Sequence, residues 1–243
     1  MILRGLLFFC ISITVASCAE IDTNTSPIIE ITDQTNNFSP PQTEKDLTKL
    51  TITELNKLIA AGDTKAKAQL GARYGLGEGV EQDLERAIEI LTEAAEDGEP
   101  EAEFFLGTAY YSGLGVPHSE MGAVVWFEKA ASKGHAAAQY WLAVLIKEGR
   151  GGISPSWGGA VPLLWKSAMQ GYGAAQFLLG YAYQTGSGIE KNSDAAAYWY
   201  RRNLNLGWDT RTVFNLALMI KEGEVEWQPG DPQDLKPPHI KSR

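Results

Sequence analysis

The chain has 243 residues, 44% of them hydrophobic, which suffices for one or two compact domains or for one repeat array. Its formal net charge of −9 excludes a general electrostatic attraction to nucleic acid or to an anionic membrane, since both are negatively charged. We therefore expect no nucleic-acid partner, and the net charge favours a basic protein partner. Both cysteines, Cys10 and Cys18, precede residue 19, so the body of the chain depends on packing instead of disulfides for its stability.

Residues 1–17 have the pattern of a secretory signal peptide. Arg4 precedes an almost wholly apolar run, residues 6–15, which is about half the length of a membrane-spanning helix. Residues 15–18 then read Val-Ala-Ser-Cys and resemble the lipobox of bacterial lipoproteins. That resemblance implies cleavage before Cys18, a diacylglycerol on its thiol and an acyl chain on its new amine. Several acyl chains on one residue form a stable membrane anchor.

The residue after this cysteine bears on the membrane that the anchor enters. Ala19 stands where an inner-membrane retention signal places an aspartate, so the resemblance implies an outer-membrane lipoprotein that faces the periplasm. Ordinary cleavage after Ala19 stays open as the alternative. Residues 18–45 are rich in Thr, Asn, Ser and Pro and have no sustained helical period. They are predicted to be a flexible tether with a typical span of roughly 30 Å.

An internal repeat of 36 or 37 residues occupies the body of the chain. Closing glycines recur at Gly62, Gly98, Gly134, Gly171 and Gly207. A second column of leucines keeps the same register, and each leucine is followed by a small residue: Leu70, Leu106, Leu142, Leu179 and Leu216. Independent columns in one register are the signature of a repeat architecture.

Each unit is predicted to be a pair of helices. In the first helix, for example residues 102–110, apolar residues fall at positions i, i+3, i+4 and i+7. A Gly-x-Gly turn follows, whose glycines permit a left-handed backbone. The second helix, such as residues 123–131, begins after an N-cap residue. The predicted N-caps are Asp83, Ser119 and either Ser193 or Asp194.

The pattern Ala-x-x-x-x-Leu-Gly-x-x-Tyr-x-x-Gly-x-Gly-Val, followed by Ala-Ala-x-x-Gly, resembles Sel1-like repeats, which are relatives of the tetratricopeptide repeat. The match covers about residues 52–223. It implies an all-α fold, a right-handed α-solenoid of about four helix-pair repeats over residues 46–223. Residues 52–61 and 212–222 are predicted to be terminal half-repeats that cap the array. The third unit departs from the pattern at residues 149–155.

Two further expectations concern a proline and the C-terminus. Pro162 lies early in the second helix of the third unit, and proline is best tolerated in a first helical turn, so we expect this helix to begin near Gly159. Residues 224–243 are Pro-rich and are predicted to be a disordered tail, with Trp227 packing back on the last helix.

Residues with the spacing of a catalytic or metal site are not found in the sequence. The histidines, His118, His135 and His239, have no other histidine or cysteine at ligand spacing. The glycine pairs recur once per unit and no lysine follows them as in a phosphate-binding loop. We therefore predict no enzyme activity, no metal and no cofactor.

Aromatic columns are predicted to form the core between helices, among them Phe104, Tyr140, Phe177 and Phe214. Columns whose residues vary from unit to unit are candidates for binding. By resemblance to tetratricopeptide-like arrays, the first helices line the concave surface. The predicted partner-binding residues there are Gln69, Arg73, Phe105, Trp141 and Leu145. The alternative is that these side chains pack on the neighbouring helix.

The resemblance implies a function in protein binding, since Sel1-like proteins are mostly adaptors or scaffolds. The sequence thus predicts a lipid-anchored periplasmic module, monomeric, that binds a protein partner on its concave surface. One alternative is an immunity protein that neutralises a toxin delivered to the periplasm. Another is a β-lactamase-like enzyme, although the proteins to which that activity is assigned have a disulfide in each repeat. A cell-envelope assembly or virulence factor is a third.

Overall fold

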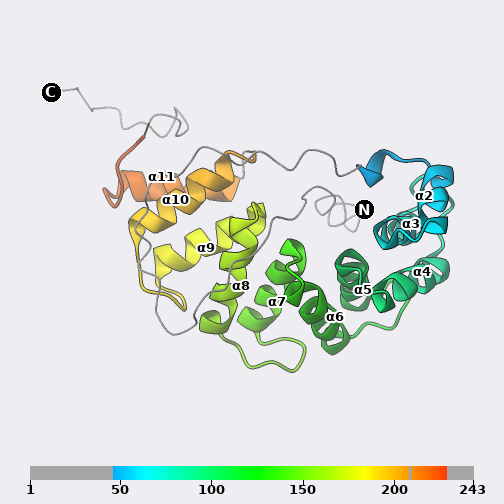
Figure 1. Cartoon of the computed structure of the whole chain (residues 1–243). Coiled ribbons are helices and arrows are strands. Elements are labelled where there is room, and N and C mark those ends of the chain that lie inside the picture. Colours follow the sequence, from blue (N-terminus) through cyan, green and yellow to red (C-terminus); the bar gives the residue numbers. More distant parts are fainter. Residues whose placement is uncertain (1–45, 208–209, 229–243) are drawn as a thin grey trace.

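The computed structural model describes residues 46–207 and 210–228, and this part of the chain contains helices and no strands. The predicted signal peptide, the lipidated Cys18, the tether up to residue 45 and residues 229–243 lie outside the described residues. The helices follow one another around an arc from α2 to α11, with α3 and α5 nearer its hollow side than α4 and α6 (Figure 1). Their bounds are η1 Leu47–Lys49, α2 Ile52–Ala60, α3 Thr64–Leu76, α4 Leu84–Glu96, α5 Pro100–Ser112, α6 Glu120–Ser132, α7 Ala136–Glu148, α8 Trp157–Met169, α9 Gly173–Thr185, α10 Ser193–Leu204 and α11 Thr210–Lys221.

Each helix packs mainly on the helix before it and the helix after it, as expected for a solenoid. The paired helices of a unit are α3 with α4, α5 with α6, α7 with α8, and α9 with α10. The predicted all-α solenoid is therefore confirmed. The half-repeats are confirmed as well: α2 precedes the first pair and buries Leu55 completely, and α11 follows the last pair.

Polar side chains set the starts of the second helices. Asp83 and Ser119 accept hydrogen bonds from backbone N–H groups three residues later, at 2.9 and 3.0 Å, as predicted. In the fourth unit the N-cap is Asn192, which accepts from the N–H of Ala195 at 2.9 Å, so the expectation of Ser193 or Asp194 is wrong. The helix begins one or two residues earlier than expected, because the Asn192 side chain already accepts a hydrogen bond from an N-terminal N–H group.

The proline of the third unit lies deeper in its helix than expected. The prediction that this helix begins near Gly159 is wrong, because Ser156 accepts a hydrogen bond from the Gly159 N–H at 3.0 Å and α8 begins at Trp157. Pro162 is therefore inside the helix, beyond its first turn. The proline removes one backbone donor there without ending the helix.

Small residues at the middle of the first helices allow the second helices to approach closely, as predicted. A Cβ atom added at Gly71, Gly107 or Gly180 would lie 2.6–2.7 Å from the side chain of Leu91, Phe127 or Tyr200. These distances are shorter than carbon atoms tolerate, so the packing of each helix pair depends on the missing side chain.

The second glycine of each turn brings successive units together. In the later units, a Cβ atom on Gly115, Gly151 or Gly188 would lie 2.5–2.9 Å from backbone at the start of the preceding unit's second helix. Gly79, in the first unit, has no such neighbour, and an added Cβ atom would meet nothing within 4 Å. These glycines therefore serve the stacking of units in addition to the positive φ of the turn.

Residues 224–228 belong to the packed array and not to a tail, so the predicted boundary at residue 223 is wrong for these five residues. Val225 is buried and Trp227 packs against the core of the last units, which confirms the expectation for Trp227. The Glu224 carboxylate accepts hydrogen bonds from Lys191 at 3.2 Å and from Ser193 at 3.3 Å. No helix follows α11 within the described residues, and this segment covers part of the core there.

Candidate interaction groove

Most of the side chains predicted to bind a partner are buried in the array. Gln69, Phe105 and Arg73 are 6–8% exposed and Leu145 is fully buried, so the prediction that they form an accessible surface is wrong. Trp141 is half-buried, with its ring 5.3 Å from that of Tyr111. The alternative interpretation, packing on neighbouring helices, describes these residues.

Arg73 is buried because its side chain binds backbone groups at the start of the described chain. Its guanidinium donates hydrogen bonds to the backbone carbonyl oxygens of Leu50 at 2.5 Å and Thr48 at 2.7 Å. The side chain thereby holds η1, at the start of the described chain, against α3. Other members of the same column, three residues after the core leucine, are also buried: Ala109, Leu145, Ala182 and Met219. This column faces the core in every unit.

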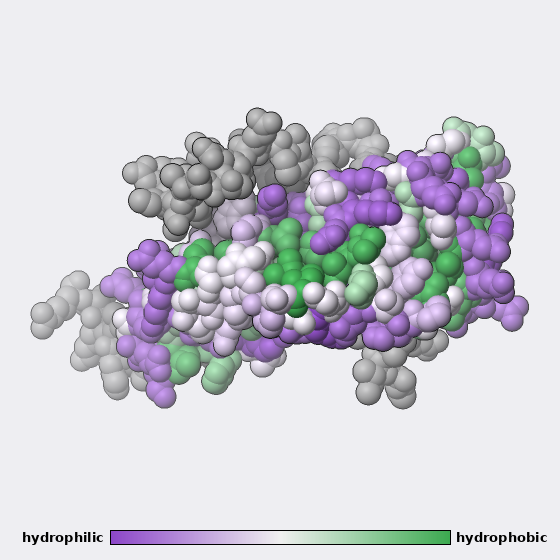
Figure 2. Space-filling model, turned by 90° about the horizontal axis from the view of Figure 1, so that it is seen from below, coloured by the Kyte–Doolittle hydropathy of each residue, from purple (hydrophilic) through white to green (hydrophobic). Residues whose placement is uncertain are grey.

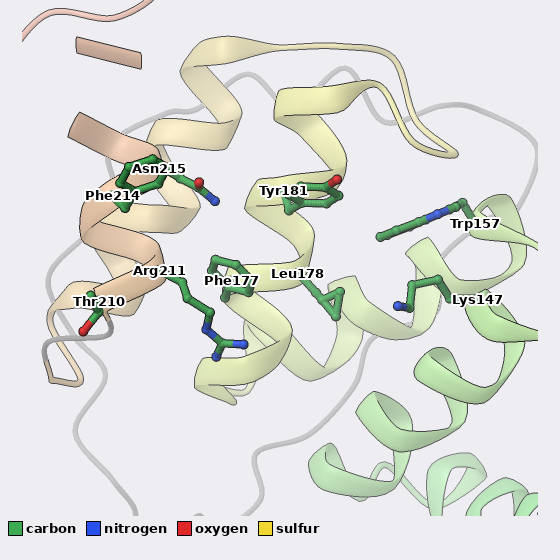
Figure 3. A pocket seen from close by; sticks show the side chains of 9 residues that line it. All are labelled: Lys147, Trp157, Phe177, Leu178, Tyr181, Thr210, Arg211, Phe214 and Asn215. Carbon is green, nitrogen blue, oxygen red and sulfur yellow. The ribbon is translucent and has the colours of Figure 1, made fainter. Parts of the chain in front are cut away.

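The column just before the core leucine does reach the surface, but at the other end of the array. Leu178 and Asn215, which occupy this column in α9 and α11, are partly exposed and line an open groove of about 630 Å³. We call it the α9–α11 groove, and its side chains are shown in Figure 3. It is lined by Lys147, Trp157, Phe177, Leu178, Tyr181, Thr210, Arg211, Phe214 and Asn215.

The groove has an aromatic lining with two exposed rings. Phe214 is 63% exposed and Tyr181 is 40% exposed. The Tyr181 ring centroid lies 6.1 Å from that of Trp157, at the start of α8. The prediction that Phe214 is core is wrong, because α11 belongs to the last unit and the described chain places no further helix pair over it. In α5 the equivalent residue, Phe104, is 2% exposed.

Two cationic side chains lie on aromatic rings of the groove. The Arg211 guanidinium carbon is 4.7 Å from the ring centroid of Phe177, and the Lys147 ammonium is 5.5 Å from that of Trp157. No aspartate or glutamate is among the nine lining residues. Burial raises the pKa of the nearby Tyr140 hydroxyl, and the positive charge of Arg211 acts in the opposite direction. The groove lining therefore combines apolar area with two cationic side chains, of which Lys147 is paired with Glu148 at 3.1 Å.

The convex side carries a second group of apolar residues. Figure 2 views the arc from this side and shows apolar side chains gathered near the middle of the face. Helix α6 contributes two exposed apolar side chains to the surface, Met121 at 65% and Val125 at 47%. These residues lie in a different unit from the groove and provide a control for it.

Over residues 46–207 and 210–228, no three His, Cys, Asp or Glu side chains come together as a possible metal site. None of the described helices is both long and apolar enough to cross a membrane.

The repeat pattern matches one protein family. A family model of the Sel1 repeat matches residues 64–99, 100–135, 136–156 and 173–207, more than half of the chain. The chain belongs to the Sel1 repeat family. Its third Sel1 match ends at residue 156, just before α8, the helix that contains Pro162. Sel1 repeat proteins are generally protein-interaction modules and typically non-catalytic scaffolds.

Solved Sel1 repeat structures resemble this one. The similarity to c5321, a protective antigen present in uropathogenic Escherichia coli strains, covers 72% of this chain with 33% identity and a TM-score of 0.66. The chain spans only 37% of the length of c5321. A Sel1 repeat protein from Oxalobacter formigenes is 28% identical, with a TM-score of 0.66, over 75% of this chain and 73% of its own.

A more distant similarity is to the immunity protein Pa5087 from Pseudomonas aeruginosa. It covers 79% of this chain and 68% of that protein, with 19% identity and a TM-score of 0.46, which is too low to support a functional argument. No curated protein sequence is significantly similar to the chain.

Proposed function

We propose that this Sel1 repeat protein binds another protein through the α9–α11 groove, on its row of first helices. The observation that carries the proposal is that one open groove holds two exposed rings, Phe214 on α11 and Tyr181 on α9, the latter 6.1 Å from Trp157. Solenoid repeats use extended surfaces of this kind for recognition. Tyr and Trp side chains are enriched among the residues that dominate binding energy at interfaces.

Burial of these rings supplies a driving force for association. Covering a largely exposed phenylalanine contributes on the order of 1–2 kcal/mol at 25 cal/mol per Å² of apolar surface. Phe177 and Leu178 lie between the two cations in the groove and extend the apolar area (Figure 3). A partner side chain inserted there would contact several rings at once.

The groove is tested by comparing two pairs of substitutions. Phe214→Ser with Tyr181→Ser changes the groove, while Met121→Ser with Val125→Ser changes equally exposed apolar residues of α6. Partners captured from cell-envelope extracts with the full chain are expected to be lost with the first pair and kept with the second. If the groove variant keeps every partner that the unaltered chain captures, the groove is not the binding surface.

We further propose that Cys18 anchors the protein by a lipid at the periplasmic face of the outer membrane. The support is the Val-Ala-Ser-Cys sequence at the end of an apolar segment and the alanine that follows it. Radioactive palmitate is expected to label the unaltered chain and not the Cys18→Ala variant. Labelling that persists in the variant would reject the anchor.

Two alternatives from the sequence remain predictions. The acidic net charge of −9 is compatible with an immunity protein that binds a basic toxin. Protection of cells that express a toxin encoded beside this gene would test that role. Turnover of a chromogenic β-lactam would test the β-lactamase-like alternative.

A further inference from the structure

We infer that the start of α8, residues 157–163, opens and closes locally in the folded protein. This opening moves Trp157, which lines the α9–α11 groove, and so makes the width of the groove adjustable. The local opening itself does not depend on the proposed function. Its effect on recognition rests on the proposed function, since Trp157 is the groove residue that this segment carries.

The first turn of α8 contains two glycines, Gly158 and Gly159, which are both exposed. Glycine weakens a helix relative to alanine, because its backbone loses more entropy when it becomes helical. At Gly158 close packing does not require the missing side chain: an added Cβ atom would meet nothing nearer than the Ser156 Oγ atom, at 4.0 Å. This glycine therefore lowers the stability of the helix without permitting a close contact.

Pro162 removes a hydrogen bond that would tie this first turn to the rest of the helix. In an α-helix the N–H of residue 162 would donate to the Gly158 carbonyl oxygen, but proline has no N–H. The Ala160 N–H donates to the Ser156 carbonyl oxygen at 3.2 Å, whereas the equivalent bond at the start of α6 is 2.9 Å. Residues 157–161 are thus held by one backbone hydrogen bond fewer than with any other residue at position 162.

The other second helices lack this combination of residues. At the positions equivalent to 158, 159 and 162, α4 has Glu85, Arg86 and Glu89, α6 has Met121, Gly122 and Val125, and α10 has Asp194, Ala195 and Tyr198. The first turns of α4, α6 and α10 also contain an acidic residue, and that of α8 contains none. Acidic residues there stabilise a helix, because its N-terminus is the positive end of its dipole. Among these four helices, α8 has the weakest start.

The opening acts on one side of the groove. Figure 3 shows Trp157 at one side, and Phe177 and Phe214 at the other. Trp157 is the first residue of α8, and its ring centroid lies 6.1 Å from that of Tyr181 on α9. Neither α9 nor α11 contains a proline. Opening of α8 therefore moves Trp157 away from Tyr181, while the side formed by α9 and α11 keeps its position.

Two contacts hold the closed form. Ser156 accepts a hydrogen bond from the Gly159 N–H at 3.0 Å. The turn of the fourth unit lies against the same segment, since a Cβ atom added to Gly188 would be 2.5 Å from the Trp157 carbonyl carbon. Both contacts are lost when the segment opens. The closed and open forms are thus two discrete arrangements, and they accept apolar side chains of different size between Trp157 and Tyr181.

Hydrogen exchange of the full chain, followed by NMR, tests the local opening. The amides of Ala160, Val161 and Leu163 are expected to exchange about 100-fold faster than the equivalent amides of α6. A Gly158→Ala, Pro162→Ala double variant is expected to remove this difference. Equal exchange at the two helix starts in the unaltered chain would overturn the inference.

Helix α6 provides a matched gain-of-function control. Met121→Gly with Val125→Pro gives residues 121–125 the Gly-Gly-Ala-Val-Pro sequence of residues 158–162. This variant is expected to speed exchange at the start of α6 and to leave α8 unchanged. Unchanged exchange at the start of α6 would show that these residues do not cause the opening, and would reject the inference. Circular dichroism verifies that the variants are folded.

NMR relaxation dispersion of the Trp157 indole N–H tests the effect on the groove. The signal is assigned by its loss in Trp157→Phe, and it is expected to show microsecond-to-millisecond exchange that disappears in the Gly158→Ala, Pro162→Ala variant. A Trp157 signal without such exchange would reject the adjustable groove. Partner capture with the Phe214→Ser, Tyr181→Ser variant tests the groove separately, so failure of the inference and failure of the proposed function are distinguishable.

Discussion

Gly107 and Gly75 are both helical glycines, yet one Cβ atom should affect them in opposite directions. A methyl group at Gly107 would lie 2.6 Å from the Phe127 ring, whereas at Gly75 the nearest atom, the Cβ of Ala87, would be 3.7 Å away. Gly107→Ala is therefore expected to lower the free energy of unfolding by about 1–3 kcal/mol. Gly75→Ala is expected to raise it by about 0.5–1 kcal/mol, because alanine loses less backbone entropy.

Urea denaturation of the two variants measures both changes. A Gly107→Ala protein as stable as the unaltered chain would show that the contact between α5 and α6 adapts to the added methyl group. Equal shifts for both variants would contradict the difference in packing.

His135 should make the fold sensitive to mild acid. Its ring lies 4.7 Å from that of Phe104, its Nδ1 accepts a hydrogen bond from the Ala138 N–H, and burial lowers its pKa from 6.5 to about 4. Between these values the unfolded chain binds a proton that the folded chain does not. Stability is therefore expected to fall as the pH drops from about 6.5 to about 4, by up to about 3 kcal/mol.

The measurement compares urea unfolding of the unaltered chain and of His135→Asn at pH 7.5 and pH 4.5. Asparagine keeps the ability to cap α7 but does not titrate. The unaltered chain should lose more stability than the variant over this interval, and the difference isolates His135 from the carboxylates. Equal losses would assign the acid sensitivity to other groups.

Residue-level sequence patterns predicted which face of a helix is apolar, but not which apolar residues remain exposed. Phe104 and Phe214 occupy one column, each two residues before a core leucine, yet they are 2% and 63% exposed. The difference arises from the unit that follows, a property of the array and not of the residue. The expectation that Gln69 and Phe105 are accessible failed for the same reason, since Leu178 and Asn215 of the same column are partly exposed.

At the scale of elements, a polar contact recurs at the same place in three successive units, but different residue types form it in each unit. It joins a first helix to the end of the second helix: Lys67 with Asp97 at 2.8 Å, Glu103 with Lys133 at 2.8 Å, and Gln139 with Gln170 at 2.9 Å. The charges are reversed between the first and second units and absent from the third. Their burial differs too, because the Glu103 side chain is 4% exposed and that of Asp97 is 48% exposed.

This difference predicts unequal costs for removing the cation. Lys133→Ala leaves a buried carboxylate without its counter-charge and is expected to destabilise the fold by about 1–3 kcal/mol. Lys67→Ala leaves a carboxylate that is about half exposed to solvent and is expected to cost less than about 1 kcal/mol. Replacing both members of the second pair by glutamine, as in the third unit, should recover much of the loss. Thermal and urea unfolding of the three variants measure these effects, and no recovery in the double variant would argue against an electrostatic cause.

In the third unit, the turn between α7 and α8 makes contacts that the sequence did not predict. The unusual sequence at residues 149–155 predicted a departure from the repeat, yet Gly149 and Gly151 have the positive φ angles of the other turns, and the sequence did not predict the contacts of Arg150 between them. Arg150 donates hydrogen bonds to the Glu120 carboxylate of α6 and, at 2.7 Å, to the Tyr111 hydroxyl. That ion pair lowers the pKa of Glu120. Glu120 and Tyr111 precede Arg150 by 30 and 39 residues, and no local sequence pattern encodes contacts over such separations.

For the whole molecule, the repeat register was sufficient to predict the family, the helix pairs and both half-repeats. It did not predict the groove, because the groove is formed where the register ends. Trp157, Tyr181 and Arg211 come from three different helices, and they meet only once the units are stacked. Residues 224–228, which have no repeat pattern, complete the core at the same end.

The C-terminal segment allows a matched truncation. Deleting residues 229–243 retains Val225 and Trp227 and is expected to lower the melting temperature less than the longer deletion does. Deleting residues 224–243 removes Val225 and Trp227 from the core and is expected to lower the free energy of unfolding by about 2–4 kcal/mol. Calorimetry of the two truncated chains measures the difference. Identical melting curves would show that the last units are stable without this cover.

The turn glycines differ in what surrounds them, and this difference determines which turn can tolerate a substitution or an inserted sequence. Gly79 requires only a left-handed backbone, so asparagine or a short labelled insertion there should preserve the fold. The corresponding turn of the second unit lies against the preceding helix, where a Cβ atom added to Gly115 would lie 2.9 Å from the Leu84 carbonyl oxygen. The first turn is therefore the natural position for a fluorophore or an epitope tag, at the opposite end of the molecule from the groove whose occupancy such a reporter would follow.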